Sequence, residues 1–243
     1  MKKFSLLLIS LMFVFYLFSQ KKDSSFFPIA VWLQQPSYAY PYKQAGINLY
    51  IGNTLNSSEW NQFKVDKMKV ICDQNAFALS HLSDTLIFGW SQQDEPDNAQ
   101  WNDVTKTYDP CIDPDTIIAR YASIRAKDTT RPVFLNMGQG VSYTNWIGRG
   151  DCSNKTNMYP VYNNGYLKGC DIASFDIYPV NSNDAVTKNN LWYVPKGIDS
   201  LRKWTEYKKP VWCWIETTKI DANSSRKPTT AEVRSEVWMA IIH

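Results

Sequence analysis

Seven short apolar runs recur along this chain of 243 residues, and segments with helical periodicity lie between them. This alternation favours an α/β fold with a parallel sheet, because neighbouring parallel strands must be joined by a long crossover, which is usually a helix. Turn-forming residues bound the runs, which have the length of strands. The predicted strands are residues 28–34, 47–51, 70–74, 86–93, 132–136, 171–178 and 210–216.

The intervening segments carry signals for the starts of helices. Asp113-Pro114-Asp115 supplies an N-cap, a proline at the first helical position and an acid in the first turn. Residues 229–232 have the spacing of a capping box, and further helices are expected over residues 57–69 and 198–207. The length is close to the roughly 250 residues of a (β/α)8 barrel, so we expect one TIM barrel domain over residues 26–243.

The chain and its predicted seventh helix end together at His243, and no eighth strand follows. We therefore expect a TIM (β/α)8 barrel truncated after the seventh β/α unit, as in a fragment of a longer reading frame. Without the last strand, the first and seventh strands should leave a gap with unpaired backbone edges. Direct pairing of these two strands, which would close the barrel without an eighth, is the alternative.

The first twenty residues have the pattern of an export signal. A basic Met1-Lys2-Lys3 precedes an apolar run from Phe4 to Phe18, which is short for a membrane-spanning helix. We expect a signal peptide over residues 1–20 and a secreted or periplasmic protein without stable membrane insertion; an uncleaved anchor is the alternative. The formal net charge of +3 indicates no nucleic-acid partner.

Cysteine and histidine usage limits the chemistry that the chain can carry. Cys72 and Cys213 lie in apolar strands, whereas Cys111 and Cys152 lie in polar loops expected on the same face, which favours a disulfide between them; free thiols are the alternative. With two histidines in the chain, a multi-histidine zinc site or a Ser-His-Asp triad is disfavoured. His81 lies in a predicted helix and is interpreted as structural. No metal or cofactor is expected.

Two glutamates follow predicted strands at the same end of the sheet. Strand alternation through residues 88–96 places Ser91 and Glu95 on the inward face, with Phe88 on the other. Glu95 then lies at the mouth of the barrel, after the fourth strand, and Glu216 ends the seventh. Hydrolysis of a glycosidic bond needs one carboxylic acid to protonate the leaving oxygen and one carboxylate to attack or to activate water.

Three short segments together resemble the clan A glycoside hydrolases. In that clan of retaining (β/α)8 enzymes, the acid/base glutamate ends strand four, usually within Asn-Glu-Pro, and the nucleophilic glutamate ends strand seven. The segments that carry the resemblance are Asp94-Glu95-Pro96, Ser174-Phe175-Asp176-Ile177-Tyr178-Pro179 and Trp214-Ile215-Glu216.

The resemblance implies a role for each matching residue. Glu95 is the expected general acid/base, Glu216 the nucleophile and Tyr178 a hydrogen-bond donor to that nucleophile. Asp94 replaces the usual asparagine, which in the clan touches the sugar 2-hydroxyl. An aspartate can accept that hydrogen bond but cannot donate one.

Further substrate contacts are expected at the carboxyl ends of the strands, where loops of a barrel build its active site. Asn136, Gln139 and Asp176 should gather there, and Trp146, in the long loop after the fifth strand, is the expected sugar-stacking platform. The predicted function is hydrolysis of O-glycosidic bonds of an oligo- or polysaccharide with retention. A non-catalytic carbohydrate-binding barrel and an inverting hydrolase are the alternatives; a larger separation of the carboxyl groups would favour inversion.

Overall fold

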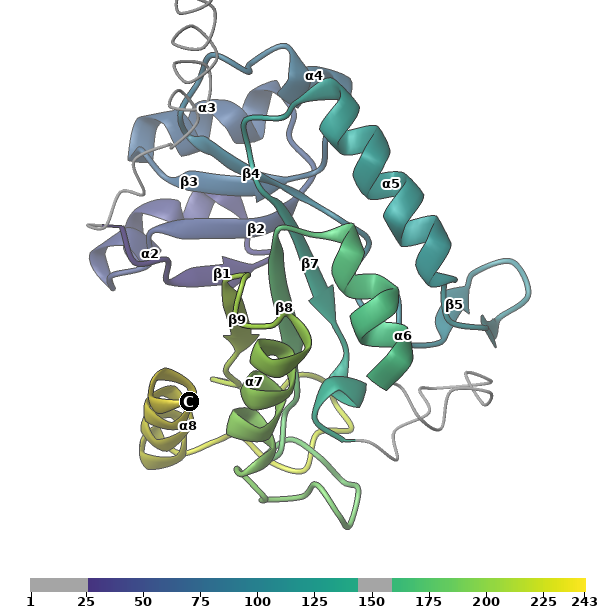
Figure 1. Cartoon of the computed structure of the whole chain (residues 1–243). Helices are drawn as coiled ribbons and strands as arrows, with labels where there is room; N and C mark the ends of the chain where they lie inside the picture. The colour runs from purple at the N-terminus through teal and green to yellow at the C-terminus, as the bar shows by residue number, and fades with distance from the viewer. Residues whose placement is uncertain (1–25, 144–158) are drawn as a thin grey trace, which may run out of the picture.

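The computed structural model describes residues 26–143 and 159–243, in which seven strands form one curled sheet (Figure 1). All neighbouring strands in this sheet pair in parallel, which confirms the predicted α/β class. The strands are arranged in sequence order, as predicted: β1 (Ala30–Trp32), β2 (Leu49–Asn53), β3 (Lys69–Cys72), β4 (Ile87–Ser91), β7 (Val133–Met137), β8 (Ile172–Asp176) and β9 (Val211–Trp214).

Helices lie around the outside of the curled sheet (Figure 1). The α-helices are α2 (Ala39–Gln44), α3 (Ser57–Asp66), α4 (Ala76–Leu79), α5 (Pro114–Lys127), α6 (Tyr159–Asn164), α7 (Tyr193–Trp204) and α8 (Thr230–Ile242). Short 3-10 turns are η2 (Pro36–Tyr38), η3 (Gln139–Val141) and η4 (Tyr166–Gly169). An antiparallel hairpin of β5 (Gln100–Asn102) and β6 (Thr107–Asp109) follows β4. The sequence patterns do not predict this hairpin.

The predicted caps fix the starts of three helices. The Asp113 side chain accepts the Asp115 N–H at the start of α5, and the capping box of Thr229 and Glu232 is present at the start of α8. Helix α3 starts at the predicted place but ends at Asp66, because the backbone turns into the left-handed region at the next residue (φ 51°). Helix α7 begins at Tyr193, five residues before the predicted start.

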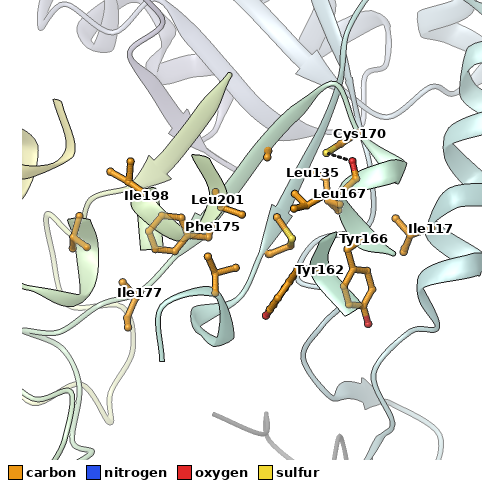
Figure 2. Close-up of a cluster of buried hydrophobic side chains, with 14 of the residues drawn as sticks. Ile117, Leu135, Tyr162, Tyr166, Leu167, Cys170, Phe175, Ile177, Ile198 and Leu201 are labelled. Atoms are coloured by element: carbon orange, nitrogen blue, oxygen red, sulfur yellow. Dashed lines mark hydrogen bonds between the residues drawn. The ribbon is translucent and has the colours of Figure 1, made fainter. Parts of the chain in front are cut away.

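Aliphatic and aromatic side chains pack between the sheet and helices α5 and α7 (Figure 2). Leu135 of β7 and Phe175 of β8 point outward into this cluster, where they meet Ile117 of α5 and Leu201 of α7. All four side chains are fully buried. Burial of this apolar surface fixes β7 and β8 against their helices, and the carboxyl ends of these two strands carry part of the candidate site.

A second apolar cluster fills the inside of the curled sheet. Trp32 of β1 and Trp214 of β9 belong to it, and their rings meet edge to face at 5.4 Å between centroids. β1 pairs only with β2, and β9 only with β8, within the described residues. The first and seventh strands therefore leave unpaired backbone edges, as predicted, and contact each other through side chains.

The predicted orientation of Phe88 is wrong. Val70 pairs with Ile87 and Ile71 pairs with Gly89, so the pairing of β3 with β4 skips Phe88. This irregularity turns the Phe88 ring into the interior cluster. The rest of β4 follows the predicted alternation: Trp90 packs on the helix side, and the Ser91 hydroxyl donates to Asp73 at the end of β3.

Candidate active site

The chain turns sharply after β4 and presents Glu95 at the carboxyl end of the sheet. Glu95 has a φ of 41°, a left-handed conformation that is costly for a residue with a side chain. Its backbone N–H donates to the Asn136 carbonyl at 2.9 Å, which ties the turn to β7. Non-glycine residues in this region need such support from their surroundings. The turn therefore places Glu95 between the ends of β4 and β7.

Asn136 joins two carboxyl groups from different strand ends. Its Nδ2 donates to Asp94 Oδ1 at 3.1 Å and lies 3.4 Å from Asp176 Oδ1. Asp176 also forms a side-chain hydrogen bond with Glu95 and receives one from the Tyr178 hydroxyl. Three carboxyl groups, an amide and a phenol thus form one network at the ends of β4, β7 and β8.

This network holds a proton near neutral pH. A hydrogen bond between two carboxyl groups requires a proton on one of them, and burial raises the pKa of Asp176 well above its usual value, with the charge of Glu95 as the second cause. The pKa of Asp94 is raised to about 6, first by desolvation in the cleft and then by the charge of Glu95. Burial therefore favours the protonated form of Asp176, whose side chain is hydrogen-bonded to Glu95.

Asp97, a buried aspartate that the sequence analysis missed, holds the turn at Glu95 in place. Asp97 Oδ1 accepts the Gly138 N–H at 2.8 Å, and its Oδ2 accepts the Tyr162 hydroxyl at 2.6 Å. Desolvation raises the pKa of Asp97 to about 6. A Cβ at Gly138 would lie 2.6 Å from the Asn98 side chain, so a glycine is needed where the two loops cross. No pattern in the sequence distinguishes Asp97 from a surface aspartate.

Glu216 lies at the same end of the sheet, but its carboxylate binds the loop at Val180 and Asn181 and not the network of Asp94, Glu95 and Asp176. Its carboxylate is 1% exposed. Its Oε1 accepts the Val180 N–H at 2.6 Å, and its Oε2 accepts the Asn181 backbone N–H at 2.8 Å and the Asn181 Nδ2 at 2.5 Å. Tyr178, the donor that the resemblance implies for Glu216, donates to Asp176 instead. The structure therefore contradicts the contact between Tyr178 and Glu216 that the resemblance implies.

A cleft of about 450 Å³ opens over the carboxyl network. Its lining includes six of the predicted site residues: Asp94, Glu95, Asn136, Gln139, Asp176 and Tyr178. Glu216 is not part of the lining, although Trp214 and Asn181 beside it are. The loops after β8 and β9 add lining residues that the sequence analysis missed: Asn183, Asp221, Asn223 and Ser224. Indole rings can stack on sugar rings, and amide, hydroxyl and carboxyl groups can form hydrogen bonds with sugar hydroxyls.

The remaining predicted residues are a tryptophan, four cysteines and His81. Trp146 and Cys152 are outside the described residues, so the platform and the disulfide partner stay predictions. Cys111 is disulfide-bonded, whereas Cys72 and Cys213 are free thiols, as is Cys170. His81 packs its ring on Phe77 and against Trp60, away from the cleft, which fits its structural interpretation.

Two solved structures share this fold. No protein-family model and no curated protein sequence matches the chain. A candidate alpha-L-fucosidase from Bacteroides thetaiotaomicron aligns over 91% of this chain and 80% of its own, with a TM-score of 0.56 and 12% identity. An endo-laminarinase from Formosa Hel1_33_131 aligns over 88% of this chain and 75% of its own, with a TM-score of 0.51 and 9% identity. The chain therefore has a fold found in glycoside hydrolases.

Residues 26–143 and 159–243 contain neither a membrane-spanning helix nor a cluster of metal-ligating side chains. No helix there is long and apolar enough to cross a bilayer. No group of three or more histidine, cysteine, aspartate or glutamate side chains in these ranges is arranged to hold a metal ion.

Proposed function

We propose that this chain hydrolyses O-glycosidic bonds of an oligo- or polysaccharide. The observation that carries the proposal is the network of Asp94, Glu95 and Asp176, three carboxyl groups that hold a proton in a cleft at the carboxyl end of the sheet. Glycoside hydrolysis needs a proton for the leaving oxygen and a carboxylate beside it. The glycoside hydrolase fold supports the same chemistry.

Glu95 is the proposed general acid/base. It lines the cleft and shares a proton with Asp176. The Asp176 proton first moves to Glu95, and Glu95 then gives it to the glycosidic oxygen. Tyr178 and Asn136 both place donors against Asp176 and stabilise the charged form that remains. In the second step Glu95 takes a proton from the attacking water.

Glu216 is the proposed nucleophile, and a covalent glycosyl-enzyme gives retention. Three N–H donors from Val180 and Asn181 bind its two oxygens, an arrangement suited to the carboxylate that a nucleophile needs. In the described arrangement these donors hold it beside the cleft. Attack on a sugar requires that the side chain turns past Trp214 and Asn181, both of which line the cleft.

The test measures release of nitrophenol from a panel of nitrophenyl glycosides and searches for a glycosyl-enzyme by intact-protein mass spectrometry. The wild-type chain should turn over and show the covalent adduct on a slow fluorosugar substrate. Glu216→Gln should lose the adduct and the turnover together. Turnover with inverted product, or a Glu216→Gln variant of normal activity, would refute the assigned mechanism.

The burial of Glu216 favours a second candidate, a carbohydrate-binding protein without turnover. A carboxylate with 1% exposure and three donors also fits a purely structural role. Calorimetric binding of oligosaccharides without hydrolysis by any preparation of the full chain would support this candidate. In either case we propose a carbohydrate partner and an exported protein, released after cleavage within residues 1–20.

A further inference from the structure

A second pair of carboxyl groups lies behind the cleft, where Glu236 of α8 faces Glu216. Glu236 is 0% exposed, and neither of its oxygens accepts a hydrogen bond from a donor within the described part of the chain. Its side chain forms a hydrogen bond with Glu216. Because two carboxylates cannot bond without a proton between them, one member of this pair is protonated.

The donors around the pair decide which member holds the proton. Glu216 accepts three N–H donors from Val180 and Asn181, all of which stabilise its charge. Glu236 has no such donor, and desolvation, followed by the charge of Glu216, raises its pKa to about 8. The proton therefore sits on Glu236, which donates to Glu216.

The other charged groups near Glu236 do not change this assignment. Glu232, one turn earlier on α8, adds negative charge, but both its oxygens accept hydrogen bonds from Arg226. Cys213 of β9 lies near Glu236 as a thiol, because burial raises its pKa to about 12. The charge of Arg226 also acts on Glu216, which favours the proton on Glu236, and neither Cys213 nor Glu232 supplies a cation to Glu236.

Helix α7 also packs against α8, and two of its charged groups, Asp199 and Arg202, meet the far end of that helix. Asp199 Oδ2 lies 3.0 Å from His243 Nδ1, and Arg202 donates to the His243 carbonyl. His243 is two turns beyond Glu236 on α8, roughly 10 Å along the helix axis. No cation from α7 therefore compensates the buried pair.

We propose that Glu236 is a positioning residue that latches Glu216. While protonated, Glu236 donates to Glu216 and, with the Val180 and Asn181 amides, holds that carboxylate behind the cleft. When the proton is lost, repulsion between two buried carboxylates drives Glu216 out of this position, toward the cleft that Trp214 and Asn181 line. The expected effect on turnover rests on the proposed role of Glu216 as nucleophile. The protonation of Glu236 does not depend on that role.

The decisive measurement is urea unfolding of the full chain and of Glu236→Gln from pH 5 to pH 9. Because the folded pKa of Glu236 lies above its unfolded value, the wild type loses stability as pH rises from about 4.5 to about 8. Glutamine keeps a donor and cannot lose a proton. The stability of Glu236→Gln relative to wild type should therefore rise across this range and level off above pH 8.

The matched control is Glu232→Gln, which makes the same substitution one turn away on α8. Hydrogen bonds from Arg226 hold the pKa of Glu232 at about 2, so it does not titrate between pH 5 and pH 9. Its stability relative to wild type should be nearly flat in pH, because the charge of Glu232 is the smallest cause of the raised Glu236 pKa. An equally flat difference for Glu236→Gln would overturn the latch.

Two further measurements keep the inference separate from folding defects and from the proposed activity. If Glu236→Gln does not fold, Glu216→Gln takes its place, since removal of that charge must reduce the alkaline loss of stability; an unchanged loss would overturn the latch. In an active enzyme, the ratio of wild-type to Glu236→Gln kcat should rise about tenfold from pH 7 to pH 9, as the deprotonated fraction of Glu236 does. Absence of turnover in both proteins counts against the proposed function alone, and a pH-independent kcat ratio counts against the latch.

Discussion

Replacing Tyr162 by phenylalanine removes one hydroxyl that donates to a buried carboxylate. The hydroxyl lies 2.6 Å from Asp97 Oδ2, and the Gly138 N–H lies 2.8 Å from Oδ1. Asp97 is 2% exposed, and desolvation raises its pKa to about 6. Above pH 6 the variant must therefore keep a buried carboxylate with one of these two donors missing.

The size of the loss should depend on pH. A hydrogen bond to a charged group contributes about 1.5–3 kcal/mol, and one between neutral groups about 0.5–1.5 kcal/mol. Because the folded pKa of Asp97 is raised, stability falls as pH rises from about 4 to about 6, and a shift of about 2 units corresponds to roughly 3 kcal/mol. Tyr162→Phe should raise this pKa further. We expect a loss of about 2 kcal/mol at pH 8 and about 1 kcal/mol at pH 4.5.

Urea unfolding at these two pH values measures the difference, with Tyr166→Phe as the matched control. The Tyr166 hydroxyl donates to the Ile112 carbonyl at 2.6 Å, a neutral acceptor, so its removal should cost the same free energy at both pH values. If Tyr162→Phe also costs the same at pH 4.5 and pH 8, Asp97 does not titrate as the structure indicates, and the argument fails.

Three further substitutions test the site and its support. Glu95→Gln should spare the first step on nitrophenyl glycosides, whose leaving groups need little protonation, and slow deglycosylation, which burst kinetics would detect; a normal steady-state rate on natural glycosides would contradict the assignment. Asn136→Ala removes the donor to Asp94, so kcat/KM should fall about 10- to 100-fold and the pKa of Asp94 should rise above about 6; a pH profile checks both. Gly197→Ala would push a Cβ into the Phe175 ring and should destabilise the chain by about 1–3 kcal/mol in thermal unfolding, with no dependence on pH.

The sheet could be predicted from the sequence because its strands are nearly continuous apolar runs. Strands of a parallel sheet with helices outside are buried on both faces, so their composition alone separates them from the helices. The caps at Asp113 and Thr229 are local signals and were equally readable. The orientation of Phe88 could not be predicted, because it results from the irregular pairing of β4 with the neighbouring strand β3. Likewise, the hairpin β5–β6 lacks a buried apolar face that would mark its strands.

The sequence predicts the positions of those site residues that lie at the ends of strands. Glu95, Asn136 and Asp176 converge because each ends or follows a strand of one parallel sheet, and such strands end at a common edge. The direction of Glu216 depends instead on the loop at Val180 and Asn181, whose amides capture its carboxylate. Loops contribute through backbone donors, which any residue can supply, so no sequence pattern reveals them.

The pair of Glu95 and Asp176 and the pair of Glu216 and Glu236 have the same arrangement. In each pair one member is the proposed catalytic group, Glu95 or Glu216, and the other, Asp176 or Glu236, is buried and carries a raised pKa. Burial thus favours the protonated forms of Asp176 and Glu236, which a substitution of the proposed catalytic glutamate leaves in place. A pH profile of Glu95→Gln should consequently still contain the ionisation of Asp176, shifted downward because the charge that Glu95 places beside it is gone. Loss of that ionisation together with Glu95 would mean that the proton belongs to Glu95 itself, and the assignment of donor and acceptor within the pair would have to be reversed.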